Sequence, residues 1–438
     1  MSAREIPGRT RSREARGPIS VIFAAWLTVS AVPGAEAFII NPSIDRWLTT
    51  SSGSRSANGD PGALTWSFAP DGTSVPDGGF STLGPSDLIA TFDTTFGAGG
   101  GGADLRLRPW FTFFEQSFAR WSELSGVTYV YEAADDGVEH GSASGQSGVR
   151  GDLRIAGAVI DGSGAVLAFN YFPDNGDMVL DTAETLLFSN VSNSHRALRN
   201  TIMHEHGHGF GLSHVSTSTD NLLMEPSINT SFDGPQLDEV RAIQFYWGDA
   251  NEKSNSGLGN QTASTATPVG PVAAGGTVRV GADADVSSQF IRPTATDFAS
   301  ITNLADTDVY AFSVSQLVEL TAVLTPMGGT FTQGSVGSIP TSFNASARVD
   351  LVLEILDTDG MSSLGLSDTS IAGGIETVVG VNLNAGDYFA RITGLDDTIQ
   401  LYQLELSTVA APEPGVFLVL GVCAGGWIGH RRSRGGSS

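Results

Sequence analysis

The sequence is poor in cysteine and in basic side chains. Cys423 is the only cysteine among 438 residues, so an intrachain disulfide is excluded. Lysine and arginine number 23 against 47 aspartates and glutamates, and the formal net charge is −24. This acidity argues against nucleic acid as a partner. It is typical of a soluble, exported protein, and carboxylates of this kind can also hold Ca²⁺.

Histidine is also scarce, with seven residues, but four of them fall in one short segment. That segment, residues 204–214, contains the pattern H-E-x-x-H-x-x-G-x-x-H without a gap. On a helix, His204 and His208 lie one turn apart on the same face, where two imidazoles can bind one Zn²⁺. Glu205 is placed to face a zinc-bound water and act on its proton. The pattern therefore predicts a catalytic zinc on this helix.

The same pattern predicts a third ligand beyond the end of the helix. Gly211 accepts a positive φ angle, so the backbone can turn sharply there and bring His214 back toward the first two histidines. Three protein ligands leave one position open, which distinguishes a catalytic zinc site from a structural one. The remaining histidines are not expected to bind the metal. His206 should project to the far side of the helix, and His140 and His195 should be exposed to solvent.

Hydrophobic periodicity divides the rest of the chain into two units. Up to Gly248, strands and helices are mixed, and after about residue 295 only strands are expected. The expected strands of the first unit cover 63–68, 127–132, 152–156 and 167–172. Its expected helices cover 86–92, 110–124, 194–207 and 237–247. The expected strands of the second unit cover 308–314, 350–356, 386–392 and 401–406. Residues 251–294, rich in Ser, Thr, Ala and Gly, are expected to form a linker or a leading strand.

Both ends of the chain carry export features. Residues 1–37 are predicted to be a signal peptide, with a basic start, a short apolar run and the cleavage pattern Ala35-Glu36-Ala37. Near the other end, Pro412-Glu413-Pro414 precedes an apolar run that closes with an arginine cluster. The basic end favours a membrane-inserted tail with its end inside the cell. This tail is therefore either a sorting signal that is later removed or an ordinary tail anchor.

The first unit, residues 60–250, resembles the catalytic domain of the metzincin zinc endopeptidases, and among them the matrixins. The zinc motif, the Leu223-Met224-x-Pro226 turn and the helix containing Ile243-Gln244 carry the resemblance. It implies a zincin-like α+β fold with His204, His208 and His214 as ligands and Glu205 as general base.

The resemblance also implies that Met224 supports the zinc site from beneath and that Asp181 and Glu184 are candidate Ca²⁺ ligands. Two departures from the family's pattern stand out. Val215 follows the third histidine, and the region 141–194 has no histidine for a second, structural zinc. With a lone cysteine at 423, latency through a cysteine-bearing pro-segment is not expected.

The later parts of the chain resemble two bacterial modules. Residues 295–408 look like a pre-peptidase C-terminal domain, which implies an all-β sandwich. We expect the region from 250 to 410 to fold alone and to be dispensable for the hydrolysis of small peptides. Residues 411–434 resemble the PEP-CTERM sorting signal, which implies processing by an exosortase in a Gram-negative bacterium. Aspartates at 306, 308, 357 and 359 are either Ca²⁺ ligands or solvated turn residues. The expected location is therefore secreted or at the cell surface, with a transient inner-membrane intermediate.

Together these features predict a secreted zinc endopeptidase that hydrolyses protein or peptide substrates. The alternative is a surface adhesin or matrix protein that uses an inactive metzincin scaffold. The presence of Glu205 favours the enzyme, because an inactive scaffold could dispense with the base. Another zinc hydrolase, such as an amidase, is disfavoured by Met224 and the third histidine.

Overall fold

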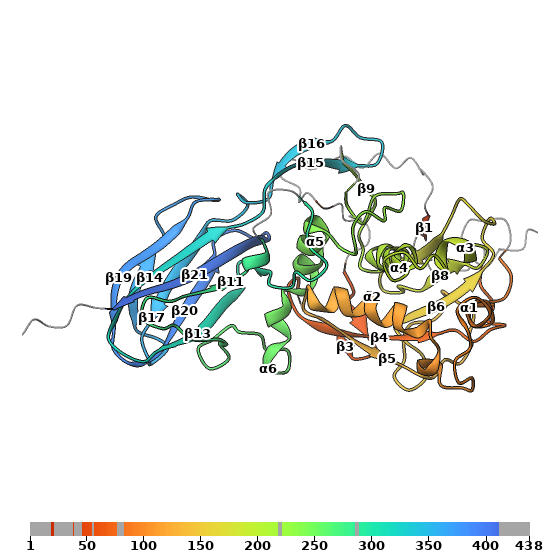
Figure 1. The fold of residues 1–438 in the computed structure, drawn as a ribbon, viewed down its shortest axis with the longest axis horizontal. Helices are drawn as coiled ribbons and strands as arrows, with labels where there is room; N and C mark the ends of the chain where they lie inside the picture. The colour runs from red at the N-terminus through yellow and green to blue at the C-terminus, as the bar shows by residue number, and fades with distance from the viewer. Residues whose placement is uncertain are drawn as a thin grey trace, which may run out of the picture.

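The computed structural model describes residues 19–21, 38, 46–54, 57–76, 83–217, 221–284 and 289–410. In this part of the chain an α+β unit precedes an all-β unit, as the sequence predicts (Figure 1). The predicted sorting segment, and the predicted signal peptide apart from residues 19–21, lie outside the described residues. Within the described ranges, no helix combines the length and the apolar character needed to cross a bilayer.

The α+β unit is built on a six-stranded sheet with the order β1-β7-β8-β6-β4-β5. Strands β5, β4, β6 and β8 run parallel to one another, whereas β7 and β1 are antiparallel to their neighbours. The strands are β1 (Ile19–Val21), β4 (Gly62–Phe68), β5 (Val127–Tyr131), β6 (Leu153–Ala158), β7 (Ala168–Tyr171) and β8 (Met178–Asp181). The helices are α1 (Leu88–Phe96), α2 (Phe111–Glu123), α3 (Thr185–Phe188), α4 (Arg196–Gly209) and α5 (Leu237–Trp247). A hairpin of two short strands, β2 (Thr49–Thr50) and β3 (Gly53–Ser54), lies between β1 and β4 in the chain.

The central strand β6 is buried on both faces of this sheet. Leu153 and Ile155 face the large core that contains the aromatic side chains of α2. Ala156 and Ala158 face a smaller core on the other side. The alternation follows from the two-residue period of a strand. Side chains of α2 and α4 belong to the same large core, so α4 packs against both the sheet and α2.

Helix α4 begins two residues later than the sequence predicts. Asn193, Ser194 and His195 have φ angles of 52°, 57° and 58°, and the cap residue His195 makes no side-chain capping bond. A serine or asparagine cap needs an extended backbone, and these left-handed residues do not supply it. Helix α5 has the predicted bounds, with a capping box between Gln236 and Glu239.

The all-β unit contains two five-stranded sheets, counting β12, that enclose a common core. One sheet has the order β10-β13-β20-β17-β18; the other has the order β11-β21-β14-β19, with β12 also paired to β21. We call these two sheets the sandwich. Their strands are β10 (Thr267–Pro271), β11 (Thr277–Val280), β12 (Ala299–Ile301), β13 (Thr307–Val314), β14 (Val318–Pro326), β17 (Leu351–Leu356), β18 (Ser363–Ser367), β19 (Glu376–Leu383), β20 (Gly386–Gly394) and β21 (Gln400–Ala410). Strands β10 and β11 lie in residues 251–294, which the sequence predicted to be either a linker or a leading strand.

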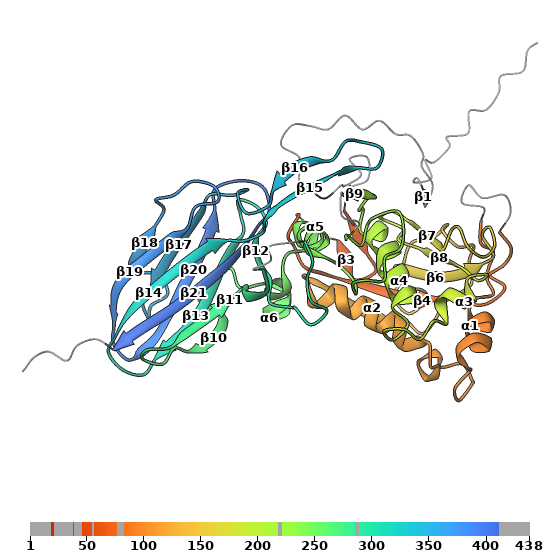
Figure 2. The same cartoon turned by 45° about the horizontal axis from the view of Figure 1, so that its top comes forward.

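One hairpin leaves the sandwich and reaches the α+β unit. It consists of β15 (Thr330–Ser335) and β16 (Thr341–Asn344), and β15 pairs antiparallel with β9 (Val215–Thr217). Figures 1 and 2 both show it extending from the sandwich across α5 toward β9. Below it, α5 residues such as Leu237 and Val240 share a buried cluster with Phe298 and Leu401. The two units therefore have a common apolar core.

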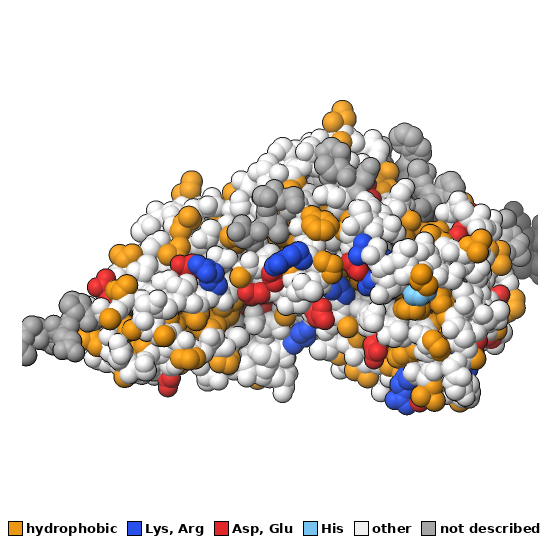
Figure 3. Space-filling view, viewed as in Figure 1, with side chains coloured by type: hydrophobic (Ala, Val, Ile, Leu, Met, Phe, Trp, Pro, Cys, Tyr) orange, Lys and Arg blue, Asp and Glu red, His pale blue; other side chains and the backbone are white. Residues whose placement is uncertain are grey.

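Charged side chains on the visible face of the molecule are mixed in sign. In Figure 3, basic and acidic side chains lie next to one another near the middle of that face. Ion pairs on exposed strands and loops include Arg279 with Glu405, at 2.6 Å, and Arg292 with Asp283, at 3.0 Å.

Candidate metal centre

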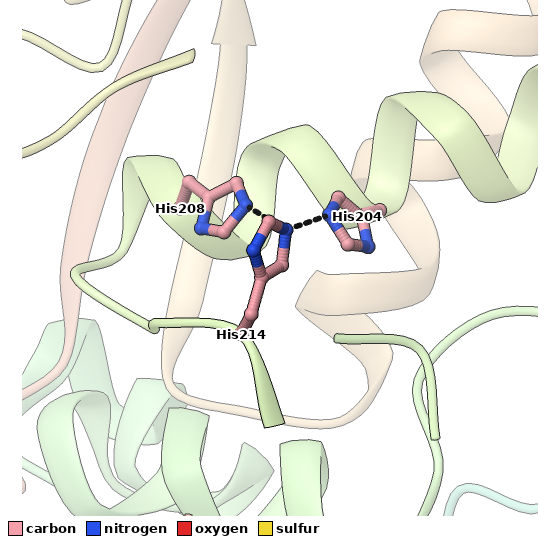
Figure 4. A group of neighbouring side chains, drawn as sticks. All are labelled: His204, His208 and His214. Carbon is pink, nitrogen blue, oxygen red and sulfur yellow. Dashed lines mark hydrogen bonds between the residues drawn. The ribbon is translucent and has the colours of Figure 1, made fainter. Parts of the chain in front are cut away.

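The three histidines predicted as ligands come together at the end of α4. His204 and His208 project from the same face of the helix, and His214 approaches them from the segment that follows (Figure 4). Gly211 makes the turn with a φ angle of 103°, as the sequence predicts. The Leu212 N–H donates to the Gly207 carbonyl at 3.0 Å and holds that turn against the helix.

The three rings approach one another through their Nε2 atoms. His214 Nε2 lies 3.1 Å from His204 Nε2 and 3.2 Å from His208 Nε2. Three nitrogens bound tetrahedrally to zinc at ~2.0–2.1 Å would lie about 3.3 Å apart. The donor set therefore fits a zinc ion in both its chemistry and its spacing, and the triad could bind a metal ion.

Backbone carbonyls fix the orientation of two of these rings. His204 Nδ1 donates to the Leu223 carbonyl at 2.6 Å, and His208 Nδ1 donates to the Leu212 carbonyl at 2.7 Å. The proton is thereby held on Nδ1, and the Nε2 lone pair faces the common point. Burial lowers the pKa of His204 to about 4 and that of His214 to about 3. The rings are therefore neutral at neutral pH, as metal ligands must be.

Glu205 is buried beside the triad and is not used by the fold. Its side chain has no exposed surface, and neither carboxylate oxygen has a hydrogen-bond partner among the described residues. Burial raises the pKa of Glu205 to about 8. A buried carboxyl group without partners carries a folding cost, so its position calls for a chemical role rather than a structural one.

Met224 lies directly beneath α4, as the resemblance implies. A Cβ on Gly207 would come within 2.4 Å of Met224 Sδ, so only glycine allows this approach. The Met224 N–H donates to Glu239 Oε1 at 3.0 Å, which ties the methionine turn to α5. Sequence reasoning missed this role of Glu239. The Q-x-x-E pattern at 236–239 indicates a cap but does not indicate the contact with Met224.

The other histidines have structural positions, and two of them differ from the prediction. His206 points away from the triad, as predicted, and its Nε2 is 2.6 Å from Tyr129 Oη. His140 is fully buried rather than exposed, with Nε2 at 3.2 Å from the Arg154 carbonyl, and burial lowers its pKa to about 3. His195 is half-buried rather than exposed, because its ring packs on Phe113 and Phe96.

A pocket of about 440 Å³ opens beside His204 and Glu205. Its walls come from α4, from the segment after Met224 and from the segment before β7. Leu167, Leu187 and Phe232 line it, and Asn200 and Thr201 add polar groups. A pocket of this size and lining can hold one apolar side chain next to the metal position.

The predicted calcium ligands Asp181 and Glu184 are both buried, just before α3, but among the described residues they do not form a group of three or more convergent metal-ligating side chains. Asp181 accepts from the Ala183 N–H at 2.8 Å and from the Asp161 N–H at 3.3 Å, and Glu184 accepts from the Gly164 N–H. Burial raises the pKa of Asp181. Asp161 is a third carboxylate in this region that sequence reasoning did not single out.

A second group of carboxylates is buried where the two units meet. Oxygens of Glu252, Asp306 and Asp308 all lie within 4.8 Å of one another. Burial and mutual repulsion raise the pKa of Glu252 to about 9, and they also raise the pKa of Asp308 well above its usual value. Within the part of the chain that the structure describes, Asp308 Oδ1 has no hydrogen-bond partner. Asp359, one of the other aspartates considered in the sequence, instead sits in an exposed turn and accepts from Ser362 Oγ at 2.6 Å.

The matrixin family model matches residues 104–279. This segment contains the histidine triad, Glu205 and α5. Matrix metalloproteinase-18 of Xenopus laevis is 29% identical over 179 residues, which are 39% of this chain and 36% of that protein. Metalloendoproteinase 4-MMP of Arabidopsis thaliana is 29% identical over 157 residues, which are 34% of this chain and 44% of that protein. The chain thus spans less than half the length of these relatives.

Two solved structures show slight likenesses to parts of the chain. The pre-peptidase C-terminal domain of a collagenase from Bacillus anthracis aligns with 32% of this chain and 96% of its own, at 12% identity and a TM-score of 0.20. A β-glucosidase from Paenibacillus barengoltzii aligns with 33% of this chain and 11% of its own, at 11% identity and a TM-score of 0.17. Likenesses this slight do not assign the sandwich to a family.

Proposed function

We propose that this protein is a secreted, zinc-dependent endopeptidase with a matrixin-like catalytic unit. One observation carries the proposal: three imidazole Nε2 atoms converge beside a buried, unpartnered carboxylate at the mouth of a pocket. The match of residues 104–279 to the matrixin family supports it. In this proposal His204, His208 and His214 hold the zinc, and the zincin-like unit covers residues 60–250.

When bound, zinc would act as a Lewis acid that activates a water molecule and polarises the scissile carbonyl. Glu205 takes the proton of the attacking water and delivers it to the amine that leaves. Neither of its carboxylate oxygens is engaged by another described residue, so both are available to accept that proton. The pocket holds one apolar side chain of the substrate and so places the scissile bond at the metal.

Calcium is the second ion in the proposal. Asp181 and Glu184 are candidate ligands, with Asp161 beside them. The buried group Glu252, Asp306 and Asp308 is another, because three carboxylates without a balancing ion repel one another. A cation there would stabilise the junction between the two units. This role is structural and separate from catalysis.

Export and processing follow from the two ends of the chain. We assign residues 1–37 to a signal peptide, 251–294 to a connection, 295–408 to a pre-peptidase C-terminal-like sandwich and 411–434 to a PEP-CTERM-type segment. An exosortase-type enzyme of a Gram-negative bacterium would cut that segment after a transient stop in the inner membrane. The mature enzyme would be located at the cell surface or outside the cell.

The test is a cleavage profile on a peptide library with the purified 38–410 chain. The proposal predicts zinc-dependent internal cleavage with an apolar residue selected on one side of the bond. Chelation should abolish the cleavage, and added zinc should restore it. A protein that binds zinc but cleaves no peptide would instead favour the alternative of an adhesin or matrix protein with an inactive metzincin scaffold.

A further inference from the structure

The β15–β16 hairpin pairs with the strand that follows the third histidine. Strand β9 begins at Val215, directly after His214. Gln333 pairs with Thr217, Gly334 with Ser216 and Ser335 with Val215. The sheet order β16-β15-β9 makes β9 the edge strand of a three-stranded sheet, of which the other two strands belong to the hairpin.

Strand β9 is held on its other side by the methionine turn. The Val215 N–H donates to the Met224 carbonyl at 3.0 Å. The Thr217 N–H and its hydroxyl both donate to Glu225 Oε1, at 2.8 Å and 2.7 Å. The segment that carries His214 is therefore fixed between the methionine turn and the hairpin. A three-residue strand with a partner on one side only would be free to move with its loop.

The hairpin is itself anchored on α5 by buried side chains. Gln333 is 3% exposed, its Nε2 donates to Asp238 Oδ2 at 3.1 Å, and its Oε1 accepts from Gln289 Nε2 at 3.0 Å. The guanidinium of Arg241 lies 4.8 Å from the centre of the Phe343 ring. Asp238 is next to Glu239, which receives the Met224 N–H. Gln333 thus links, through its backbone and its side chain, the two segments that support the triad.

We propose that the β15–β16 hairpin positions the third zinc ligand, so that the metal centre is complete only when the sandwich is present. The proposal rests on the zinc assignment made above. It reverses the expectation from sequence that the region from 250 to 410 folds alone and is dispensable for the hydrolysis of small peptides. Gln333 is a positioning residue: it does not touch the metal or the substrate.

The first test removes the hairpin. The Ala345 N–H already donates to the Gly329 carbonyl at 2.7 Å, so an Asn-Gly turn can replace residues 330–344 and close the strands at that pair. Zinc affinity is measured by competition with a chelator, Co²⁺ replaces zinc as a spectroscopic probe, and amide exchange is followed at 214–217. We expect a zinc Kd raised about 10–100-fold, an altered Co²⁺ absorption spectrum and faster exchange at 214–217.

The second test is a matched pair of point variants in the full chain. Gln333→Leu removes the two side-chain bonds and keeps the backbone pairing, whereas Thr332→Ala changes the exposed neighbour on the same strand. We expect the zinc Kd to rise about 10-fold in Gln333→Leu and to stay unchanged in Thr332→Ala. If the hairpin deletion does not fold, this pair decides.

Wild-type values of the zinc Kd, the Co²⁺ spectrum and the exchange rates in Gln333→Leu would overturn the proposal. None of these three readouts requires peptide hydrolysis. A hairpin-dependent zinc Kd in a protein that cleaves no peptide would therefore support the positioning role and contradict the proposed endopeptidase function. Peptide cleavage by a protein whose zinc Kd does not depend on the hairpin would support the endopeptidase function and contradict the positioning role.

Discussion

Gly207 packs its Cα against the thioether of Met224, and a Cβ there would come within 2.4 Å of the sulfur. Gly207 lies between Glu205 and His208 on α4, on the face turned toward the methionine turn. The absence of a side chain at Gly207 thus sets how closely the turn approaches the helix that carries His204 and His208.

Gly207→Ala is therefore expected to push the methionine turn away from α4. Overpacking of a buried contact costs about 1–3 kcal/mol, and the displaced turn should also loosen His204, whose Nδ1 donates to Leu223. We expect a lower melting temperature and a higher zinc Kd. Gly209→Ala is the comparison on the same helix: its Cβ would meet Asn170 Nδ2 at 3.0 Å and His206 Nδ1 at 3.2 Å, which is a milder overpacking, so we expect a smaller effect. Equal effects of the two substitutions would argue against a special role of the Met224 contact.

His208→Ala should remove the zinc, because two imidazoles on separate segments do not retain the ion that three hold together. Elemental analysis should find one zinc per wild-type chain and much less in the variant. His195→Ala is the matched control, since His195 packs on Phe113 away from the triad, and it should keep its zinc. Stoichiometric zinc in His208→Ala would refute the ligand assignment.

Asp177 makes the stability of the α+β unit depend on pH. It is fully buried near Arg154, and burial raises its pKa from 3.8 to about 7. The folded protein therefore binds this proton more tightly than the unfolded chain. The resulting stabilisation is complete below about pH 4 and is lost as the pH rises through about 7.

The measurement compares melting temperatures at pH 5 and pH 8. Asp177→Asn should show a smaller decrease between the two than the wild type, because the amide does not ionise. Asp136→Asn serves as the control, since the Asp136 pKa is lowered by its exposed contact with Arg150. An unchanged decrease in Asp177→Asn would show that other groups cause the pH dependence.

Calcium should stabilise the junction through the buried carboxylates. At a hundredfold excess over its Kd, a bound ion contributes about 2.7 kcal/mol to the free energy of unfolding. We expect CaCl₂ to raise the melting temperature of the wild type by several degrees and to have a much smaller effect on Asp308→Asn. Asp359→Asn, in an exposed turn, should respond like the wild type. A full calcium response in Asp308→Asn would exclude Asp308 as a ligand.

The convergence of the three histidines could be predicted because these residues lie close in the sequence. Helical period places His204 and His208, and one glycine explains the return of His214. The bounds of α5 were also predicted, because Q-x-x-E at its start and glycine after its end are local signals. What the sequence did not show are the contacts between distant segments. The partner of Met224 is Glu239, and the partner of β9 lies more than a hundred residues further along the chain.

Exposure was harder to predict than position. His140 follows a polar stretch and looks solvated in the sequence, yet it is buried under Arg154. Asp306 and Asp308 resemble turn aspartates, but the junction between the two units covers them together with Glu252. In both cases the burial comes from segments packed from elsewhere in the chain, which no local pattern reports.

The central claim is that Glu205 serves as the base of a zinc peptidase. The decisive measurement digests casein with equal amounts of wild-type and Glu205→Ala protein and determines the zinc content of both. Our account predicts one zinc per chain in each, with proteolysis reduced by about 10²–10⁴-fold in the variant. Unchanged digestion by zinc-loaded Glu205→Ala, or no digestion by the zinc-loaded wild type, would contradict it.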